Sequence, residues 1–169
     1  MDAQLQELLD RKACEDVVMR YGRTLDWLDQ AGQEGCFWPD ADIDYGFFKG
    51  SGKDWVPLVM EVEAGTSRRW HVSTGVMVQV RGDRAKSECY GLTVATSENE
   101  QGEPVDTMFG GRYLDEFEKR KGQWRISKRF YTADWTHQFP NGLDALASSG
   151  LMLNILQIQQ PGHESYRRL

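Results

Sequence analysis

The stretch from Met108 to Trp135 constrains the fold of this sequence most, because it reads as two long strands joined at Lys121-Gly122. Past the turn, apolar and polar residues alternate, with Trp124, Ile126 and Phe130 set against Arg125, Ser127, Arg129 and Tyr131. Such a period of two predicts a sheet with two different faces. The glycine of the turn can supply the positive φ that a tight hairpin needs.

Two adjacent glycines, Gly110 and Gly111, stand inside the first of these strands. Glycine within a strand usually marks a bulge or a bend, so we expect the hairpin to be bent there. A bent central hairpin makes the sheet concave, and other parts of the chain must then fill its hollow.

Helices are expected to fill that hollow from the N-terminal part of the chain. Residues 2–30 carry apolar side chains at helical spacing from Leu5 onward, which predicts one long amphipathic helix. Gly22 lies within this helix and permits a close approach to the sheet, and Gly32 is expected to end it. A short helical turn over residues 34–38, a strand over 42–48 and a helix over 55–63 capped by Asp54 are expected next.

Strands dominate the chain from there to Trp135. Residues 71–81 and 86–96 are β-rich around a Gly82-Asp83 turn, and the hairpin begins at Val105. Helices that precede an antiparallel sheet indicate the α+β class, here a cone open at one end. We expect one domain over residues 1–135 and a C-terminal extension over 136–169, which begins irregularly, forms a helix over 143–159 and ends in a loose tail.

Composition argues against several classes of function. The net charge of −6 and the pI of about 5.1 disfavour a nucleic-acid or an anionic-membrane partner. The sequence has no apolar signal-peptide core and no run of membrane length, and its three cysteines lack metal-type spacing, so we expect a cytoplasmic protein with reduced thiols. No glycine-rich phosphate loop and no histidine-rich cluster occurs, so we expect no cofactor and no metal.

Four segments in sequence order carry a family resemblance: RYGRTLDWLD, PDADIDYGFFKG, RWHVSTG and GGRYLDEFEKRKGQWRISKRFYTADW. Together they resemble the SnoaL-like branch of the NTF2-like superfamily over residues 5–135. The resemblance implies an α+β cone whose cavity holds a small apolar molecule. The superfamily includes dehydratases, dehydrochlorinases, cyclases, isomerases and lyases of aromatic compounds, and also members without catalytic activity.

The resemblance also implies roles for individual residues. Asp26 and His71 match an acid–base pair that scytalone dehydratase shares with hexachlorocyclohexane dehydrochlorinase. Tyr45 matches a dehydratase tyrosine that holds a catalytic water, and Arg129 matches a pocket arginine of the dehydrochlorinase. In this scheme His71 moves a proton, Asp26 orients its ring, and Tyr45 or Arg129 assists the leaving group.

Two departures from the family pattern leave the substrate open. Tyr90 stands where the dehydratase has a second histidine, and Tyr21 stands where the dehydrochlorinase has a lysine. With Tyr113, Met108 and Trp70, they are the residues expected to contact the substrate.

The same residues allow plainer roles. A lone strand histidine is more often a satisfied structural residue than a catalyst, although Trp70 beside His71 suggests an apolar setting. On a helical wheel, Asp29 lies nearer the apolar stripe than Asp26 does.

Arg129 can instead form a salt bridge to Asp134 or Glu116 at the rim of the sheet, and the tyrosines can be ordinary strand aromatics. Met108 and Phe109 are better suited to the core and the cavity wall than to a special site.

The leading hypothesis is a cofactor-independent lyase that eliminates a small group, such as water, from a small hydrophobic, aromatic or polycyclic substrate. The same pair could break a C–C bond and release a small aldehyde, or act in a double-bond isomerase or a cyclase. A non-catalytic ligand-binding or assembly domain is the alternative of a different class.

Two expectations concern assembly and the extension. The resemblance implies a homodimer or homotrimer through the convex face of the sheet, with Trp124, Ile126 and Phe130 covering that face. The helix over residues 143–159 has a broad apolar face, which is expected to close the cavity mouth and exclude water, or else to pack on a neighbouring subunit.

Overall fold

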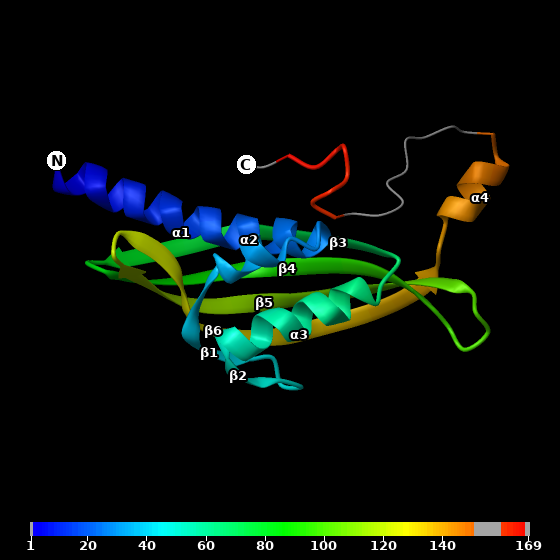
Figure 1. Ribbon diagram of the computed structural model, residues 1–169, viewed down its shortest axis with the longest axis horizontal. Helices are drawn as coiled ribbons and strands as arrows, with labels where there is room; N and C mark the ends of the chain where they lie inside the picture. The colour runs from blue at the N-terminus through cyan, green and yellow to red at the C-terminus, as the bar shows by residue number, and fades with distance from the viewer. Residues whose placement is uncertain (1, 151–159, 168–169) are drawn as a thin grey trace.

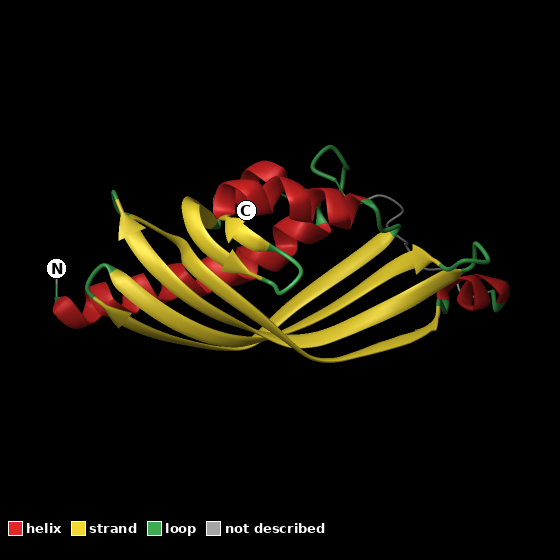
Figure 2. Cartoon of the chain, turned by 90° about the horizontal axis from the view of Figure 1, so that it is seen from below, coloured by secondary structure: helices red, strands yellow, loops and turns green. Residues whose placement is uncertain are grey.

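The computed structural model describes residues 2–150 and 160–167 of the chain. There, one curved sheet carries a long helix and two shorter ones on its concave side (Figures 1 and 2). The elements follow in the order α1 (Ala3–Asp26), α2 (Gln30–Glu34), β1 (Phe37–Asp44), β2 (Lys49–Ser51), α3 (Gly52–Ala64), β3 (Arg68–Arg81), β4 (Arg84–Glu98), β5 (Pro104–Arg120), β6 (Gln123–Pro140) and α4 (Leu143–Ser148). The predicted α+β class is confirmed.

The described part of the sheet has six strands in the order β2-β1-β6-β5-β4-β3. Strands β3 to β6 form the predicted antiparallel meander, and β1 extends it by pairing with β6 in parallel. Several boundaries differ from expectation. The strand predicted over 42–48 runs from Phe37, where a helical turn was predicted, to Asp44, and β2 was not predicted. Strand β6 continues to Pro140 through a segment predicted to be irregular. Of the helix predicted over 143–159, the structure shows α4, which ends at Ser148 and is followed by a turn at residues 149–150, and residues 151–159 lie outside the described part of the chain.

Helix α1 packs on the sheet through Cys14, Val17, Val18, Tyr21 and Leu25, all at most 2% exposed. Its apolar stripe does not bury the first two turns, however, and Leu5, Leu8 and Leu9 remain about half exposed. Within the described ranges, no helix is long and apolar enough to cross a membrane.

The long helix ends at Asp26 rather than near residue 30, because Leu28 adopts a positive φ of 50° that breaks it. Asp29 then caps α2 by accepting a hydrogen bond from the backbone N–H of Gly32. The cap of α3 also differs from the prediction: Ser51 accepts from the Asp54 N–H and donates to its carboxylate, so Asp54 is not itself the cap.

The β5–β6 hairpin turns at Lys121 and Gly122, with φ values of 52° and 78°, as predicted. The register shifts at Gly110/Gly111, where a bulge was expected, and Asp134 of β6 is the extra residue. A second shift at Glu116/Phe117, with Ser127 as the extra residue, was not predicted.

This second bulge corrects the predicted faces of β6. A one-residue insertion reverses the alternation of side chains, so Trp124 and Ile126 share the helix-covered face with Arg129, and Phe130 faces the other way. Trp124 and Ile126 are 6% and 0% exposed within their own chain. They therefore do not cover the convex face, as had been expected of them.

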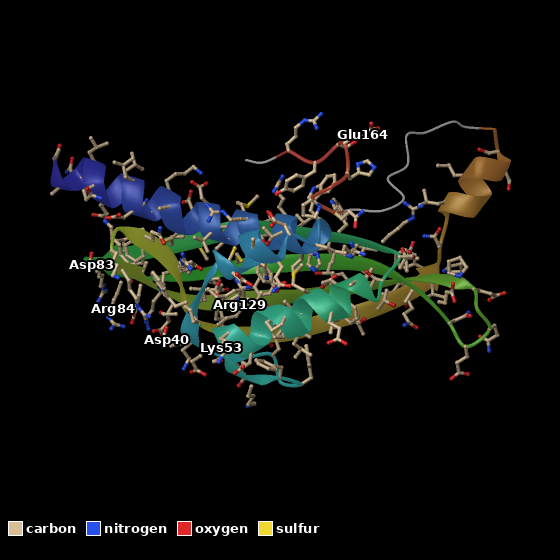
Figure 3. All side chains as sticks on the ribbon, viewed as in Figure 1. Asp40, Lys53, Asp83, Arg84, Arg129 and Glu164 are labelled. Atoms are coloured by element: carbon tan, nitrogen blue, oxygen red, sulfur yellow. The ribbon has the colours of Figure 1, made fainter. Side chains whose placement is uncertain are left out.

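Arg129 lies in the interior between the helices and the sheet (Figure 3) and is 0% exposed. Its guanidinium donates two hydrogen bonds of 2.7 Å to the carboxylate of Asp115, and it lies 4.1 Å and 4.3 Å from the ring centres of Tyr21 and Tyr113. Its partner is neither of the two predicted acids: Asp134 pairs with Arg112 instead. Burial alone would lower the pKa of Arg129, but Asp115 raises it well above its usual value.

We predict that Arg129→Met lowers the free energy of unfolding by about 3–5 kcal/mol, because it leaves Asp115 as an unpaired buried charge. The double variant Arg129→Met/Asp115→Leu should recover most of that loss. Arg112→Met, which breaks the half-exposed pairs with Asp134 and Glu88 on the outer face, should cost less than about 1 kcal/mol. Urea unfolding measures all three, and equal losses for Arg129→Met and Arg112→Met would contradict the assignment.

Candidate active site

His71 lies at the centre of the candidate site, on the helix-covered face of β3. Its Nδ1 lies 2.8 Å from Oδ1 of Asp26, and its backbone N–H donates to Oδ2 of the same carboxylate at 3.3 Å. Its Nε2 lies 3.4 Å from Oε1 of Glu63, at the end of α3. The predicted pairing of Asp26 with His71 is therefore present, and the ring contacts a second carboxylate that the sequence did not indicate.

Three elements meet to build this arrangement. Gly22 of α1 lies against His71, where an added Cβ would be 3.1 Å from the histidine Cβ, so the predicted close approach of helix and sheet is confirmed. Asp26 follows one turn later as the last residue of α1, and Asp29 faces elsewhere as the cap of α2. Glu63 enters from α3, and the side chains of His71, Asp26 and Glu63 are only 6%, 13% and 11% exposed.

A buried arginine completes the group. Arg69, two residues before His71 on β3, has its Nε 4.0 Å from Oε2 of Glu63 and donates to the carbonyl oxygens of Asp26 and Thr66. The site thus sets two basic side chains among two carboxylates. Burial lowers the pKa of Arg69. Burial also raises the pKa of Asp26, and this effect exceeds the lowering that the hydrogen bond from His71 produces.

The two carboxylates decide the charge of His71. Burial alone would lower its pKa, but the hydrogen bond to Asp26 and the nearby carboxylate of Glu63 raise it to about 9. The ring is therefore an imidazolium near neutral pH. Nε2 is not a free nitrogen in this arrangement, because it already faces Glu63.

The donor set does not suit a metal ion. Asp26 and Glu63 face opposite nitrogens of one imidazole ring, so their oxygens do not converge on a common point with a histidine nitrogen. No group of three His, Cys, Asp or Glu elsewhere in the described residues is arranged to hold one.

Tyr45 belongs to the Arg129 cluster. Its hydroxyl lies 2.7 Å from that of Tyr21 and 3.4 Å from Nη1 of Arg129, and its ring stacks on Trp55 with 4.0 Å between centres. Burial raises the pKa of Tyr45, so its hydroxyl stays protonated. The roles predicted for Tyr45 and Arg129 in helping a leaving group depart stay predictions, and here both side chains are engaged by buried partners.

A row of small residues on the concave face separates this cluster from His71. Ser73, Gly91, Gly111 and Ala133 lie side by side across β3 to β6. The far end of the Tyr113 ring lies over Gly91, and the hydroxyl of Tyr131 lies over Gly111. Both tyrosines therefore point along the sheet toward the next row, which contains His71.

That next row is partly open. It runs from His71 through Thr93 and Phe109 to Thr136, and Phe109 is 41% exposed. Tyr131 and Phe109 were not among the predicted site residues, because their face could not be assigned before the bulges were known.

Three predicted substrate contacts face the wrong way. Trp70 precedes His71 directly, so it must point to the opposite face, and it is 57% exposed there. Met108 shares the cross-strand row of Trp70, and Tyr90, 49% exposed, lies under the guanidinium of Arg112 on the same convex face. Only Tyr21 and Tyr113 of the predicted contacts lie on the inner side.

The C-terminal extension reaches the site's edge through its tail. The Tyr166 hydroxyl donates to Asp29 at 2.7 Å, and its ring packs on Trp27 and under Arg23. The tail was expected to be loose, and these contacts show that Tyr166 is held. Helix α4 lies at the far end of β6 (Figure 1), where Leu143 and Leu146 border a surface hollow with Trp70. The predicted lid falls largely on residues outside the described ranges and stays a prediction.

The comparisons with known proteins agree with this fold. Residues 6–130 match the family model of the SnoaL-like domain, so the chain belongs to the SnoaL-like family, and that part of the resemblance stated above is confirmed. No curated protein sequence matches the chain.

Three solved structures illustrate the likeness. A proposed scytalone dehydratase from Novosphingobium aromaticivorans DSM 12444 is 18% identical with a TM-score of 0.69, and the match covers 94% of this chain and 97% of that one. The hexachlorocyclohexane dehydrochlorinase LinA-type3 from Novosphingobium barchaimii LL02 is 18% identical with a TM-score of 0.68, over 81% and 94% of the two chains. An NTF2-like superfamily protein from Salmonella enterica serovar Typhimurium str. LT2 is 17% identical with a TM-score of 0.62, over 72% and 91%. At these identities the likeness shows a shared fold.

The raised pKa of His71 predicts how stability depends on pH. The folded chain binds the proton more tightly than the unfolded chain, so the stabilisation is complete below about pH 6.5 and is lost as the pH rises through about 9. The loss should be on the order of 3 kcal/mol, at 1.36 kcal/mol per pKa unit. Urea unfolding between pH 6 and 10 should show this decline in the wild type and a much smaller one in His71→Gln. Equal slopes in the two proteins would contradict it.

Proposed function

We propose that the chain is a cofactor-independent lyase that acts by general acid–base catalysis on a small, largely apolar substrate. The observation that carries the proposal is the buried His71 ring, held at 2.8 Å by Asp26 where the concave face of the sheet begins to open. Asp26 fixes the ring through Nδ1 and also through the backbone N–H of His71, which leaves Nε2 as the position for proton transfer.

The chemistry is a β-elimination. A C–H bond next to an activating group breaks, its electron pair forms a C=C bond, and the C–O or C–halogen bond on the neighbouring carbon breaks. In a dehydration, one proton is lost from carbon and one is gained by the departing hydroxide. The products are therefore the alkene and water. A positioned acid or base of this kind contributes typically ~10²–10⁴ in rate.

The surroundings favour a flat, apolar substrate. Thr93 and Phe109 share the cross-strand row of His71 on the concave face, where Tyr131 also lies. The row of Ser73, Gly91, Gly111 and Ala133 has no bulky side chain of its own. Two of the similar structures are named as a proposed dehydratase and a dehydrochlorinase, and both names denote elimination reactions, which supports the reaction class.

The test is a screen of the purified protein, without added cofactor, against hydroxylated aromatic and halogenated alicyclic compounds, read by mass change. We expect loss of water or of hydrogen halide, and a fall of about 10² or more in rate for Asp26→Asn and His71→Asn. His137→Asn, on the exposed convex side, should retain the wild-type rate. Loss of formaldehyde would assign C–C cleavage, and tight binding without any mass change would favour a non-catalytic ligand-binding domain.

We also propose that a second copy of the chain covers the convex face of the sheet. Large apolar side chains on that face are 38–63% exposed, and they form the convex patch: Trp70, Met77, Tyr90, Leu114, Phe130 and Trp135. A group of large exposed apolar side chains on one sheet face is typical of a subunit interface, and the family resemblance favours a homodimer or homotrimer.

Light scattering at micromolar concentration should report a dimer or trimer for the wild type. Leu114→Lys/Phe130→Lys should shift it toward the monomer, because two charges enter the middle of the convex patch. Met19→Lys, equally exposed on the outer side of α1, should leave the assembly unchanged. A monomeric wild type would refute this proposal.

A further inference from the structure

The proposed function does not say which side chain removes a proton from the substrate and which donates one to the leaving group. The contact between Glu63 and His71 bears on this question, and the inference rests on that proposed function. His71 has a carboxylate at each ring nitrogen, Asp26 from α1 and Glu63 from α3, and Arg69 comes from its own strand. With His71 protonated, these four groups sum to zero charge. With His71 neutral, one ring nitrogen would turn a lone pair toward a carboxylate in a buried place. In the resting site the His71 imidazolium therefore carries a proton on Nε2, beside Glu63, as well as the one on Nδ1 beside Asp26.

The two carboxylates differ in how firmly they are held. Both oxygens of Asp26 accept hydrogen bonds from His71, one from the ring at 2.8 Å and one from the backbone at 3.3 Å. Glu63 makes longer contacts, 3.4 Å to Nε2 and 4.0 Å to Arg69, both beyond the usual hydrogen-bond distance of roughly 2.7–3.2 Å. Asp26 is thus committed to positioning the ring. Glu63 can turn toward a substrate without giving up a short bond.

We propose that Glu63 is the general base of the elimination and that His71, as the imidazolium, is its general acid. Glu63 takes the proton from the substrate carbon, and its electron pair forms the C=C bond. The C–O bond breaks, and the departing oxygen takes the Nε2 proton of His71 and leaves as water. The proton on Glu63 then passes to Nε2 across the contact between them. One turnover removes water from the substrate and restores both catalytic groups, with no other proton donor or acceptor required.

The position of Glu63 supports this role. Its carboxylate is buried on the inner side of α3, in line with Trp55, Val59 and Met60, where an acidic side chain would otherwise be unfavourable. Glu61, two residues earlier on the same helix, is exposed, so it offers a matched control.

The first test reads the charge of His71 without any substrate. The chain has only three histidines, so NMR titration of labelled histidine is simple, and His71→Asn identifies the signal of His71. Glu63→Gln should lower the pKa of His71 by about 1 unit or more, because an opposite charge within reach raises it by ~1–3 units. Glu61→Gln should leave that pKa unchanged. An unchanged value in Glu63→Gln would overturn the proposal.

The second test uses turnover of the substrate found in the screen. Glu63→Gln should lower kcat by about 10² or more with a smaller change in KM, Glu63→Asp should recover part of the loss, and Glu61→Gln should match the wild type. Wild-type activity should fall as the pH rises above about 9, where the acid loses its proton. A wild type inert toward every compound counts against the lyase itself. An active wild type whose kcat survives Glu63→Gln counts against Glu63 alone.

Discussion

The bond between Asp26 and His71 is the interaction on which the rest of the site depends, because it joins the end of α1 to the edge strand β3 inside the protein. A buried carboxylate is unfavourable unless it is paired, and here the pairing also fixes where the helix lies along the sheet. Gly22 favours the bond, since a Cβ at that position would lie only 3.1 Å from the His71 Cβ and would force a small shift of helix or strand. Glu63 and Arg69 then add a second anion and a second cation, so the group is balanced in charge.

A second buried ion pair stands deeper in the same layer. Arg129 and Asp115 are enclosed by tyrosine rings and hold the hydroxyl of Tyr45, with no exposed surface on the arginine. Between the two groups lies the row of small residues covered by Tyr113 and Tyr131. The inner pair therefore keeps the tyrosines in place, and the outer group meets the open part of the concave face. On the inner side of that row Arg129 is 0% exposed, and on the side of His71 Phe109 is 41% exposed.

Much of the fold could be predicted because its signals are local. Lys121-Gly122, the glycine pair at the bulge and Gly22 each act through backbone conformation or lack of a Cβ, which a sequence displays directly. The bulge at Ser127 has no such signal, and one extra residue reversed the faces assigned to Trp124, Ile126 and Phe130. The helical wheel favoured Asp29 because it assumed a continuous helix, and Leu28 breaks that helix before Asp29 is reached.

Of the site, the Asp26–His71 pair could be predicted and its third partner could not. Glu63 lies at the end of the apolar face of α3, with Trp55 and Val59. An acidic residue at that position was the one sequence signal that could have indicated a buried carboxylate in the site. The error over Trp70 was avoidable, since neighbours on a strand point to opposite faces. Tyr90 and Met108 required the register of β4 and β5, which depends on pairing between distant segments.

The central claim is that His71 is held as an imidazolium between two carboxylates. Nitrogen-15 NMR at neutral pH tests it most directly, through the one-bond coupling of each ring nitrogen of His71 to its own hydrogen. The account predicts that both Nδ1 and Nε2 carry a hydrogen at pH 7, one directed at Asp26 and the other at Glu63. A neutral ring with a hydrogen on only one nitrogen at that pH would contradict it.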